Sequence, residues 1–274
     1  MAAASIARDP AGTLRLVQFT DLHLLGDSAE RLRGMDTDAT FRAVLAAARR
    51  DLAAADLLLL TGDLAEHGEA AAYARLRAHL HALDTDLPTR AIPGNHDHPR
   101  RLAAAFPESG PDRCAELALG EWRILLLDSS VPGQSAGRLE ARQLAWLEGR
   151  LERASERHAL VVLHHPPLPI GSAWLDAIAL ENGPELLACL DRQDPVRGVL
   201  FGHIHQAFER RRRGVRHFAT PSTCVQFVPR TERVEVDPAM PGWRTLALRP
   251  DGRIRTRVRR VAEGQSAAER PTSA

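Results

Sequence analysis

The sequence contains few cysteines and no lysine. Its three cysteines, Cys114, Cys189 and Cys224, are far apart and form no Cys-x-x-Cys pair. Zinc ribbons and disulfide frameworks need closely spaced or evenly paired cysteines, so neither is supported, and a reducing cytoplasm is the expected location. All 36 basic residues are arginines, which excludes a catalytic or Schiff-base lysine.

A strong net charge and long apolar runs are also lacking. The 36 basic residues are balanced by 35 acidic residues, and the formal net charge is +1. Because nucleic acids and membrane surfaces attract strongly basic faces, we expect neither as a partner. No apolar run approaches the length of a membrane span, and Met1–Gly12 lacks the pattern of a signal peptide. The sequence therefore predicts a soluble intracellular protein.

Histidine, by contrast, is abundant. The chain has 12 histidines, although aromatic residues make up only 4% of it and tyrosine occurs once. Histidine is the commonest metal ligand and the usual acid or base at neutral pH. Scattered histidines would mean little, so their position relative to the predicted strands decides how they are interpreted.

Strand-like and helix-like segments alternate along the chain. Short apolar runs predict strands, and apolar residues spaced three or four apart predict helices. The predicted strands are 14–19, 57–60, 89–92, 122–127, 160–163, 196–201, 215–220, 244–248 and 254–258. The predicted helices are 37–51, 68–83, 139–154 and 184–190. This alternation predicts an α/β fold.

The domain organisation is predicted to be simple. Hydrophobic residues make up 44% of the chain, which excludes disorder of the whole chain. We see no linker-like stretch that would divide it, so we expect one domain at 14–261 after a short N-terminal segment, 1–13. The polar, small residues of 262–274 predict a disordered tail.

Polar clusters follow five of the predicted strands. They are, in chain order, Asp21 with His23, Asp63, Asn95 with His96, His164, and His203 with His205. Folds of this class place their sites beyond the carboxyl ends of strands. Gly62, Gly94 and Gly202 precede three of the clusters and permit a close approach of the backbone. We therefore expect the clusters to meet at one centre.

The candidate ligands combine oxygen and imidazole nitrogen. Such a mixed set suits divalent ions such as Fe, Mn, Zn or Co, and the lack of cysteine argues against a structural zinc site. The seven candidates are Asp21, His23, Asp63, Asn95, His164, His203 and His205. This number exceeds the need of one ion. Two ions that share one carboxylate would use all seven, and ion pairs about 3.5–4 Å apart serve in-line displacement at phosphorus.

The ordered motifs Asp-x-His, Gly-Asp, Gly-Asn-His-Asp, His-x-Pro and Gly-His-x-His resemble the calcineurin-like metallophosphoesterases. Further segments resemble the bacterial class III cyclic-nucleotide phosphodiesterases within that family. These are 21–24, 60–65, 125–129, 172–176, 202–206, 219–227 and 241–246. The resemblance, over roughly 14–260, implies a four-layer αββα sandwich of two mixed sheets flanked by helices. It also implies hydrolysis of 3′,5′-cyclic AMP, and of cyclic GMP, to the 5′-nucleotide.

The same resemblance implies a role for each site residue. One metal would be held by Asp21, His23, Asp63 and His205, and the other by Asp63, Asn95, His164 and His203. Asp63 would bridge the ions, and a water activated between them would attack phosphorus opposite the ribose O3′. His96 would protonate the leaving oxygen, and Asp97 would orient His96. Asn95, His96 and His205 would contact the substrate phosphate. The neighbouring His165 leaves the choice of His164 as ligand open.

Several alternatives stay open at this point. The same centre would serve a broader phosphodiesterase that acts on glycerophosphodiesters, 2′,3′-cyclic nucleotides or pyrophosphate linkages. A non-catalytic scaffold with the same fold is a minor alternative, because such a protein is expected to have lost ligands. Trp174 and the segment 220–227 either shape a pocket for a base or simply pack. For a phosphodiesterase the expected partner is a small-molecule substrate, and the chain is expected to be a monomer or homodimer.

Two arginine-rich segments have simple structural interpretations. Arg210–Arg213 precedes Gly214 and predicts a solvated hairpin turn. The arginines of 253–260 alternate with other residues, which is typical of a half-exposed strand. The balanced net charge makes a nucleic-acid surface the weaker interpretation of both.

Overall fold

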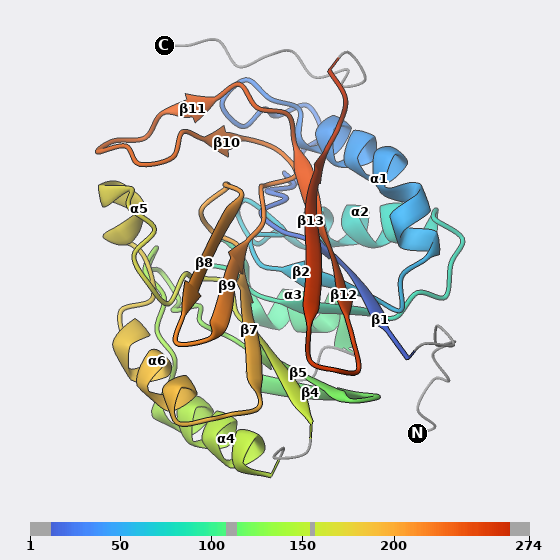
Figure 1. Ribbon diagram of the computed structural model, residues 1–274. Helices are drawn as coiled ribbons and strands as arrows, with labels where there is room; N and C mark the ends of the chain where they lie inside the picture. Colours follow the sequence, from blue (N-terminus) through green and yellow to red (C-terminus); the bar gives the residue numbers. More distant parts are fainter. Residues whose placement is uncertain (1–11, 108–113, 154–156, 264–274) are drawn as a thin grey trace.

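Two β-sheets pack face to face at the centre of the protein, and helices cover their outer faces (Figure 1). The computed structural model describes residues 12–107, 114–153 and 157–263. The four layers, helices, sheet, sheet and helices, are the αββα sandwich implied by the motifs. The predicted fold class is confirmed.

The first sheet holds the strands that lead to the first three polar clusters. It consists of β1 (Leu14–Phe19), β2 (Leu57–Thr61), β3 (Thr89–Ile92), β12 (Gly242–Leu248) and β13 (Ile254–Arg260). Their order is β13-β12-β1-β2-β3. The strands β1, β2 and β3 are parallel, whereas β12 and β13 are antiparallel neighbours. The sheet is therefore mixed.

The second sheet holds the strands that lead to the remaining clusters. It consists of β4 (Cys114–Leu119), β5 (Trp122–Leu127), β6 (His158–Val162), β7 (Val196–Phe201), β8 (Phe208–Arg212) and β9 (Val215–Ala219). Their order is β4-β5-β6-β7-β9-β8. The inner strands β5, β6, β7 and β9 are parallel, and the edge strands β4 and β8 are antiparallel to their neighbours. This sheet is mixed as well.

The apolar run at β2 shows how the layers are built. Leu57 and Leu59 point toward the second sheet, where they join a cluster that includes Ile124. Leu58 and Leu60 point the other way and join the cluster under the helices. Because alternate side chains of a strand face opposite sides, a strand between two apolar layers needs a continuous apolar sequence.

Helices cover both outer faces. On the first sheet lie α1 (Thr37–Ala53), α2 (Ala70–His81) and α3 (Pro99–Ala105), and on the second α4 (Ala141–Glu152), α5 (Ala173–Asp176) and α6 (Gly183–Asp191). The first helix illustrates the local causes. The Asp36 carboxylate accepts the Ala39 amide hydrogen at 2.9 Å and so caps the helix. Phe41, Val44 and Ala48 are buried at helical spacing.

The structure adds elements that the sequence pattern does not predict. These are α3, β4, α5, β8 and a two-stranded ribbon of β10 (Gln226–Phe227) and β11 (Val236–Asp237). Most are too short for a periodic signal. The predicted turn at Arg210–Arg213 is wrong in extent, because Arg210–Arg212 belong to β8. The turn is Arg213–Gly214, where both residues have positive φ.

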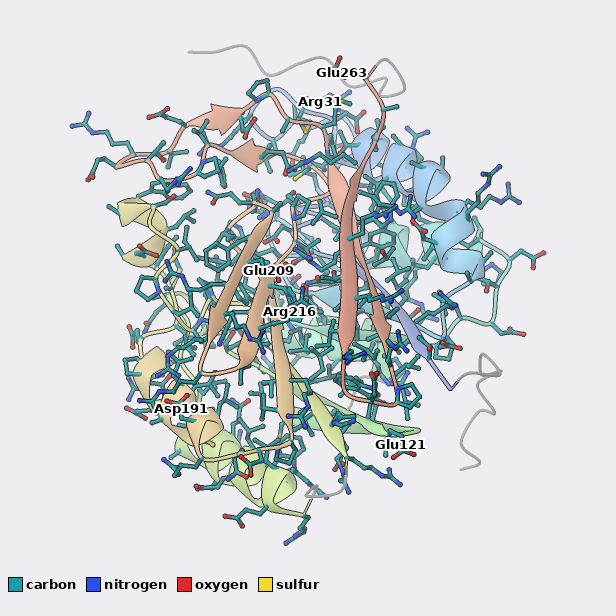
Figure 2. The ribbon with its side chains drawn as sticks, in the orientation of Figure 1. Arg31, Glu121, Asp191, Glu209, Arg216 and Glu263 are labelled. Atoms are coloured by element: carbon teal, nitrogen blue, oxygen red, sulfur yellow. The ribbon has the colours of Figure 1, made fainter. Side chains whose placement is uncertain are left out.

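Two charged residues of the edge strand β8, Glu209 and Arg212, form ion pairs. Arg216 lies 2.6 Å from Glu209 (Figure 2), and Arg212 pairs with Asp191. The arginines of 255–259 lie on the half-exposed strand β13, as predicted. Among the described residues, no helix combines the length and apolarity needed to span a membrane. The division into 1–13, 14–261 and 262–274 stays a prediction, since 1–11 and 264–274 lie outside the described residues.

Candidate metal centre

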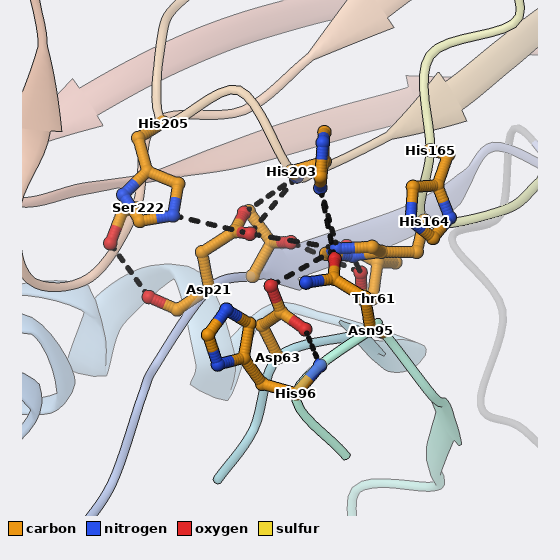
Figure 3. A network of polar contacts seen from close by, with 12 residues as sticks. Asp21, Thr61, Asp63, Asn95, His96, His164, His165, His203, His205 and Ser222 are labelled. Atoms are coloured by element: carbon orange, nitrogen blue, oxygen red, sulfur yellow. Dashed lines mark hydrogen bonds and ion pairs between the residues drawn. The ribbon is translucent and has the colours of Figure 1, made fainter. Parts of the chain in front are cut away.

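All the predicted ligands lie together beyond the carboxyl ends of their strands, and Figure 3 labels each of them except His23. The first sheet supplies Asp21 and His23 after β1, Asp63 after β2 and Asn95 after β3. The second sheet supplies His164 after β6, and His203 and His205 after β7. The parallel strands of each sheet end at one edge, and the packed sheets bring the two edges together. The fold therefore brings the seven candidate ligands together.

The backbone at these positions adopts a conformation that ordinary residues rarely take. Among the described residues, nine non-glycine residues have positive φ. Five of the nine are predicted ligands: Asp21, His23, Asp63, His203 and His205, with φ between 48° and 70°. Left-handed residues of this kind cost stability and gather at functional sites. The strand ends are therefore shaped to turn these side chains toward one point.

Glycines allow the strand ends to approach one another. A Cβ added to Gly94 would lie 2.2 Å from the Asp63 Oδ1 atom, and one added to Gly202 would lie 2.9 Å from the Asp21 Oδ2 atom. Both distances are far inside van der Waals contact. The glycines that precede the motifs thus let the ligand carboxylates sit directly against neighbouring backbone.

Four groups of side chains among the described residues could each hold an ion, and two of these groups share Asp21. The ligand atoms of Asp21, His23 and His205 lie within 4.8 Å of one another, as do those of Asp21, Asp63 and His164. The His205 Nε2 atom is 3.1 Å from the His23 Nε2 atom and 3.5 Å from the Asp21 Oδ1 atom. The His164 Nε2 atom is 3.2 Å from the Asp63 Oδ2 atom. Each of the two groups thus combines a carboxylate with at least one imidazole.

A third contact places the remaining two ligands beside the second group. The His203 Nδ1 atom lies 3.1 Å from the Asn95 Oδ1 atom and 3.3 Å from the His164 Nε2 atom. Asp21 is tied to the same strand end, because its carboxylate accepts the His203 amide hydrogen at 3.0 Å. The seven side chains therefore form one continuous polar cluster.

The orientation of the imidazoles fits bound cations. The His205 Nδ1 atom donates to the Val225 carbonyl at 2.7 Å, and the His23 Nδ1 atom donates to the Glu66 carboxylate at 2.5 Å. In the neutral rings, the two Nε2 lone pairs then face each other at 3.1 Å. Two acceptors hold such an approach only when a proton or a metal ion lies between them. The donor set therefore fits a metal centre.

The pKa values of the buried groups also favour a site that binds cations. Burial would raise the pKa of the Asp63 carboxyl, but His164 and His23 hold that pKa well below its usual value. Burial would lower the pKa of His164, but the adjacent Asp63 raises it to about 9. Burial would also lower the pKa of His23, but the hydrogen bond to Glu66 and the adjacent Asp63 raise it to about 9. The cluster attracts positive charge, and bound divalent cations would displace these protons.

The structure also separates His164 from its neighbour. The His164 Nδ1 atom donates to the Thr61 carbonyl at 2.8 Å, which turns Nε2 toward Asp63. Both ring nitrogens of His165 have other partners, the Ser129 hydroxyl at 2.8 Å and the Ser135 carbonyl at 3.1 Å. Burial and the adjacent His164 lower the pKa of His165 to about 3, so its ring is neutral. This geometry favours His164 as the ligand.

Comparison with known proteins agrees with the geometry. The sequence profile of the calcineurin-like phosphoesterases matches residues 14–207. The chain belongs to this family. Metallophosphoesterases use a dinuclear metal centre, and the Asp and His groups described above are its candidate ligands in this chain.

Individual phosphoesterases resemble the chain over most of its length. The 3′,5′-cyclic adenosine monophosphate phosphodiesterase CpdA of Escherichia coli is 42% identical over 251 residues, which cover 91% of this chain and 90% of CpdA. A 3′,5′-cyclic-nucleotide phosphodiesterase of Nostoc sp. is 38% identical over 90% of this chain and 92% of its own. A dimetal phosphatase from Danio rerio shares the fold with a TM-score of 0.66 at 15% identity, covering 93% of this chain and 100% of its own.

One predicted role in this phosphoesterase needs correction. The Asp97 carboxylate accepts the amide hydrogens of Leu64 and Ala65 at 3.1 Å, that of Gly94 at 2.9 Å and the Tyr73 hydroxyl at 2.9 Å. Burial and the charge of Asp63 raise its pKa to about 6. The expectation that Asp97 orients His96 is therefore wrong. Asp97 instead ties the loop after β2 to the loop after β3.

Glu66 takes the place expected of Asp97. Its backbone carbonyl accepts a hydrogen bond from the His96 Nδ1 atom at 2.9 Å, and its carboxylate lies 3.5 Å from the same nitrogen. The same carboxylate holds the His23 Nδ1 atom at 2.5 Å. The motifs did not indicate Glu66, because it lies 43 residues from His23 and only the fold brings them together. Glu66 orients both rings.

We expect Glu66→Gln to lower the affinity for metal about 10–100-fold, the range typical of partners that orient a ligating histidine. Glutamine keeps the size of the side chain but removes the negative charge beside His23. Metal titration followed by elemental analysis measures the change. Glu69→Gln is the matched control, because the Glu69 carboxylate accepts the Gly26 amide hydrogen at 2.7 Å. Equal affinity in the two variants would contradict the role of Glu66.

Proposed function

We propose that this phosphoesterase hydrolyses 3′,5′-cyclic AMP to 5′-AMP with two divalent metal ions bound. The observation that carries the proposal is the 42% identity to a cyclic AMP phosphodiesterase over nine-tenths of both chains. The convergence of all seven candidate ligands supports it, because a non-catalytic scaffold would have no need to keep them. Fe, Mn, Zn and Co all suit the mixed oxygen and nitrogen donors.

Each side chain of the centre has a proposed task. Asp21, His23, Asp63 and His205 would hold one ion, and Asp63, Asn95, His164 and His203 the other. When bound, two divalent cations favour deprotonation of a water and offset the charge of the phosphate. Asn95, His96 and His205 would contact that phosphate.

His96 is proposed to supply a proton to the leaving ribose O3′. Its Nδ1 atom donates to the Glu66 carbonyl at 2.9 Å, so Nε2 is the nitrogen left to serve the substrate. Its amide hydrogen also bonds to the Asp63 Oδ1 atom at 2.9 Å, which fixes the residue beside the centre. A positioned histidine of this kind is a suitable general acid.

The direct test compares phosphodiesters on the metal-loaded protein. We expect cyclic AMP to be hydrolysed with a higher kcat/KM than bis(p-nitrophenyl) phosphate or a glycerophosphodiester, with 5′-AMP as product. A chelator should abolish turnover, and added Mn²⁺ should restore it. A kcat/KM for cyclic AMP far below that of bis(p-nitrophenyl) phosphate would contradict the proposal and favour a broader phosphodiesterase. Elemental analysis of protein purified from its own host identifies the metals.

We further propose a cytoplasmic location. Cys189 and Cys224 are free thiols, and unpaired thiols are typical of a reducing compartment. Cyclic AMP would meet the enzyme there as a freely diffusing small molecule.

A further inference from the structure

An aromatic surface lies directly beside the metal centre. The Phe227 ring stacks on the His205 imidazole, with ring centroids 4.6 Å apart and planes inclined by 24°. The Trp174 indole meets the Phe227 ring at 87°, with centroids 5.0 Å apart. Phe227 and Trp174 are half-buried, so each residue is partly accessible to solvent. We call these two rings the aromatic wall, which continues outward from a candidate metal ligand.

The aromatic wall is held in place by hydrogen bonds between distant segments. The Ala173 amide donates to the Thr231 carbonyl at 3.1 Å, and the Trp174 indole N–H donates to the Thr231 hydroxyl at 3.3 Å. The Arg230 amide donates to the buried Ser172 hydroxyl at 2.8 Å. The helix α5 is thereby fastened beneath the outer end of the β10–β11 ribbon (Figure 1). These hydrogen bonds hold the aromatic wall in a defined position in the fold.

The inner side of the ribbon is anchored as well. Phe227 packs against a small apolar cluster of Met35, Cys224 and Val225. The exposed guanidinium of Arg33, from the loop after β1, lies 6.0 Å from the centroid of the Phe227 ring. Three parts of the chain therefore meet beside His205 and present two aromatic rings and one planar cation. Rings and guanidinium planes are the groups on which nucleobases stack.

We propose that the aromatic wall is the nucleobase subsite, on which the base of the substrate stacks while its phosphate lies at the metal centre. This inference rests on the proposed function. In a 3′,5′-cyclic nucleotide the ribose separates the base from phosphorus, so a base-binding surface has to lie a short distance outside the ligands. The wall begins at His205 and extends away from it. Every base has a flat face, so stacking favours large purines without distinguishing adenine from guanine.

The test removes the base from the substrate and the rings from the protein. The substrates are cyclic AMP and methyl riboside 3′,5′-cyclic phosphate, which is the same cyclic diester without a base. For Trp174→Leu and Phe227→Leu, we expect the ratio of kcat/KM for cyclic AMP to kcat/KM for the baseless diester to fall at least about fivefold. The fall should appear mainly in KM, because stacking holds the base before and during the reaction.

Matched control variants are available elsewhere in the fold. Trp146 and Phe208 are also half-buried and pack against the same apolar cluster as Trp174, but Trp146 stacks on Arg150 and Phe208 lies near Phe201. Trp146→Leu and Phe208→Leu should leave the substrate ratio unchanged. Melting temperatures of all four variants show whether each is folded. Trp174→Phe and Phe227→Tyr, which keep a ring, should retain most of the ratio.

The substrate series with the unaltered enzyme gives an independent result. We expect similar KM values for cyclic AMP and cyclic GMP, a higher one for cyclic UMP and the highest for the baseless diester. Equal KM values for cyclic AMP and the baseless diester, or an unchanged ratio in both leucine variants, would overturn the subsite while leaving cyclic AMP hydrolysis in place. An enzyme that hydrolyses other phosphodiesters but not cyclic AMP would overturn the proposed function and the subsite together.

Discussion

Asp63→Asn is expected to lower kcat/KM for cyclic AMP by at least about a thousandfold and to reduce the metal content of the protein. The Asp63 Oδ2 atom lies 3.2 Å from the His164 Nε2 atom and 3.8 Å from the His23 Nε2 atom. Its carboxylate therefore lies near one histidine of each proposed ion site. An amide at this point removes one negative charge that both metal ions are proposed to share.

Asparagine is chosen because it should leave the fold in place. Asp63 has a φ of 51°, and asparagine tolerates this left-handed conformation well. The amide oxygen can still accept the His96 amide hydrogen that Oδ1 accepts at 2.9 Å. Elemental analysis and steady-state assays measure the result. The melting temperature of the metal-free variant reports whether it is folded.

The other end of the same strand supplies the control. Asp56 precedes β2, is 8% exposed and accepts the Arg15 amide hydrogen at 2.7 Å. Asp56→Asn changes a buried aspartate in the same way but away from the centre, so both metal content and kcat/KM should stay close to those of the parent. If Asp63→Asn kept two ions per chain and full turnover, the bridging role would be wrong.

The convergence of the candidate metal ligands could be predicted from the sequence because its causes are local. Each ligand follows a strand whose apolar run is visible, and parallel strands end at a common edge. The need for glycine at positions 94 and 202 could be inferred for the same reason. A side chain at Gly94 would collide with the Asp63 carboxylate, and one at Gly202 would collide with the Asp21 carboxylate. Strand β2 shows the principle for the fold: its four leucines predict burial on both faces, and the structure places apolar layers on both sides.

What the sequence did not indicate depends on contacts between distant segments. Glu66 reaches His23 across 43 residues, and no spacing rule links an acid in one loop to a histidine in another. Asp97 adjoins His96 in the chain, yet its carboxylate turns to the Leu64 and Ala65 amides. The helix α5 has four residues and the ribbon strands two each, so their order comes from mutual hydrogen bonds and not from periodicity.

His96→Ala is expected to lower kcat for cyclic AMP about 10²–10⁴-fold while the metal content stays unchanged. The imidazole shares a group with His23 and Glu66 but lies outside the two groups that contain Asp21, so its loss should leave the proposed ion ligands in place. The ribose O3′ is a poor leaving group because it departs as an alkoxide unless it receives a proton. Loss of the proton donor should therefore slow bond cleavage more than substrate binding, and KM should change less than kcat.

A comparison of substrates with different leaving groups distinguishes acid catalysis by His96 from a purely structural role. A p-nitrophenolate departs readily without a proton, so His96→Ala should slow bis(p-nitrophenyl) phosphate far less than cyclic AMP. His79→Ala is the control, because His79 pairs with Asp38 at 2.6 Å on the helices of the first sheet and should affect neither substrate. Equal losses on both substrates would show that His96 positions the phosphate or the loop without donating a proton. Unchanged turnover of cyclic AMP would remove His96 from the reaction altogether.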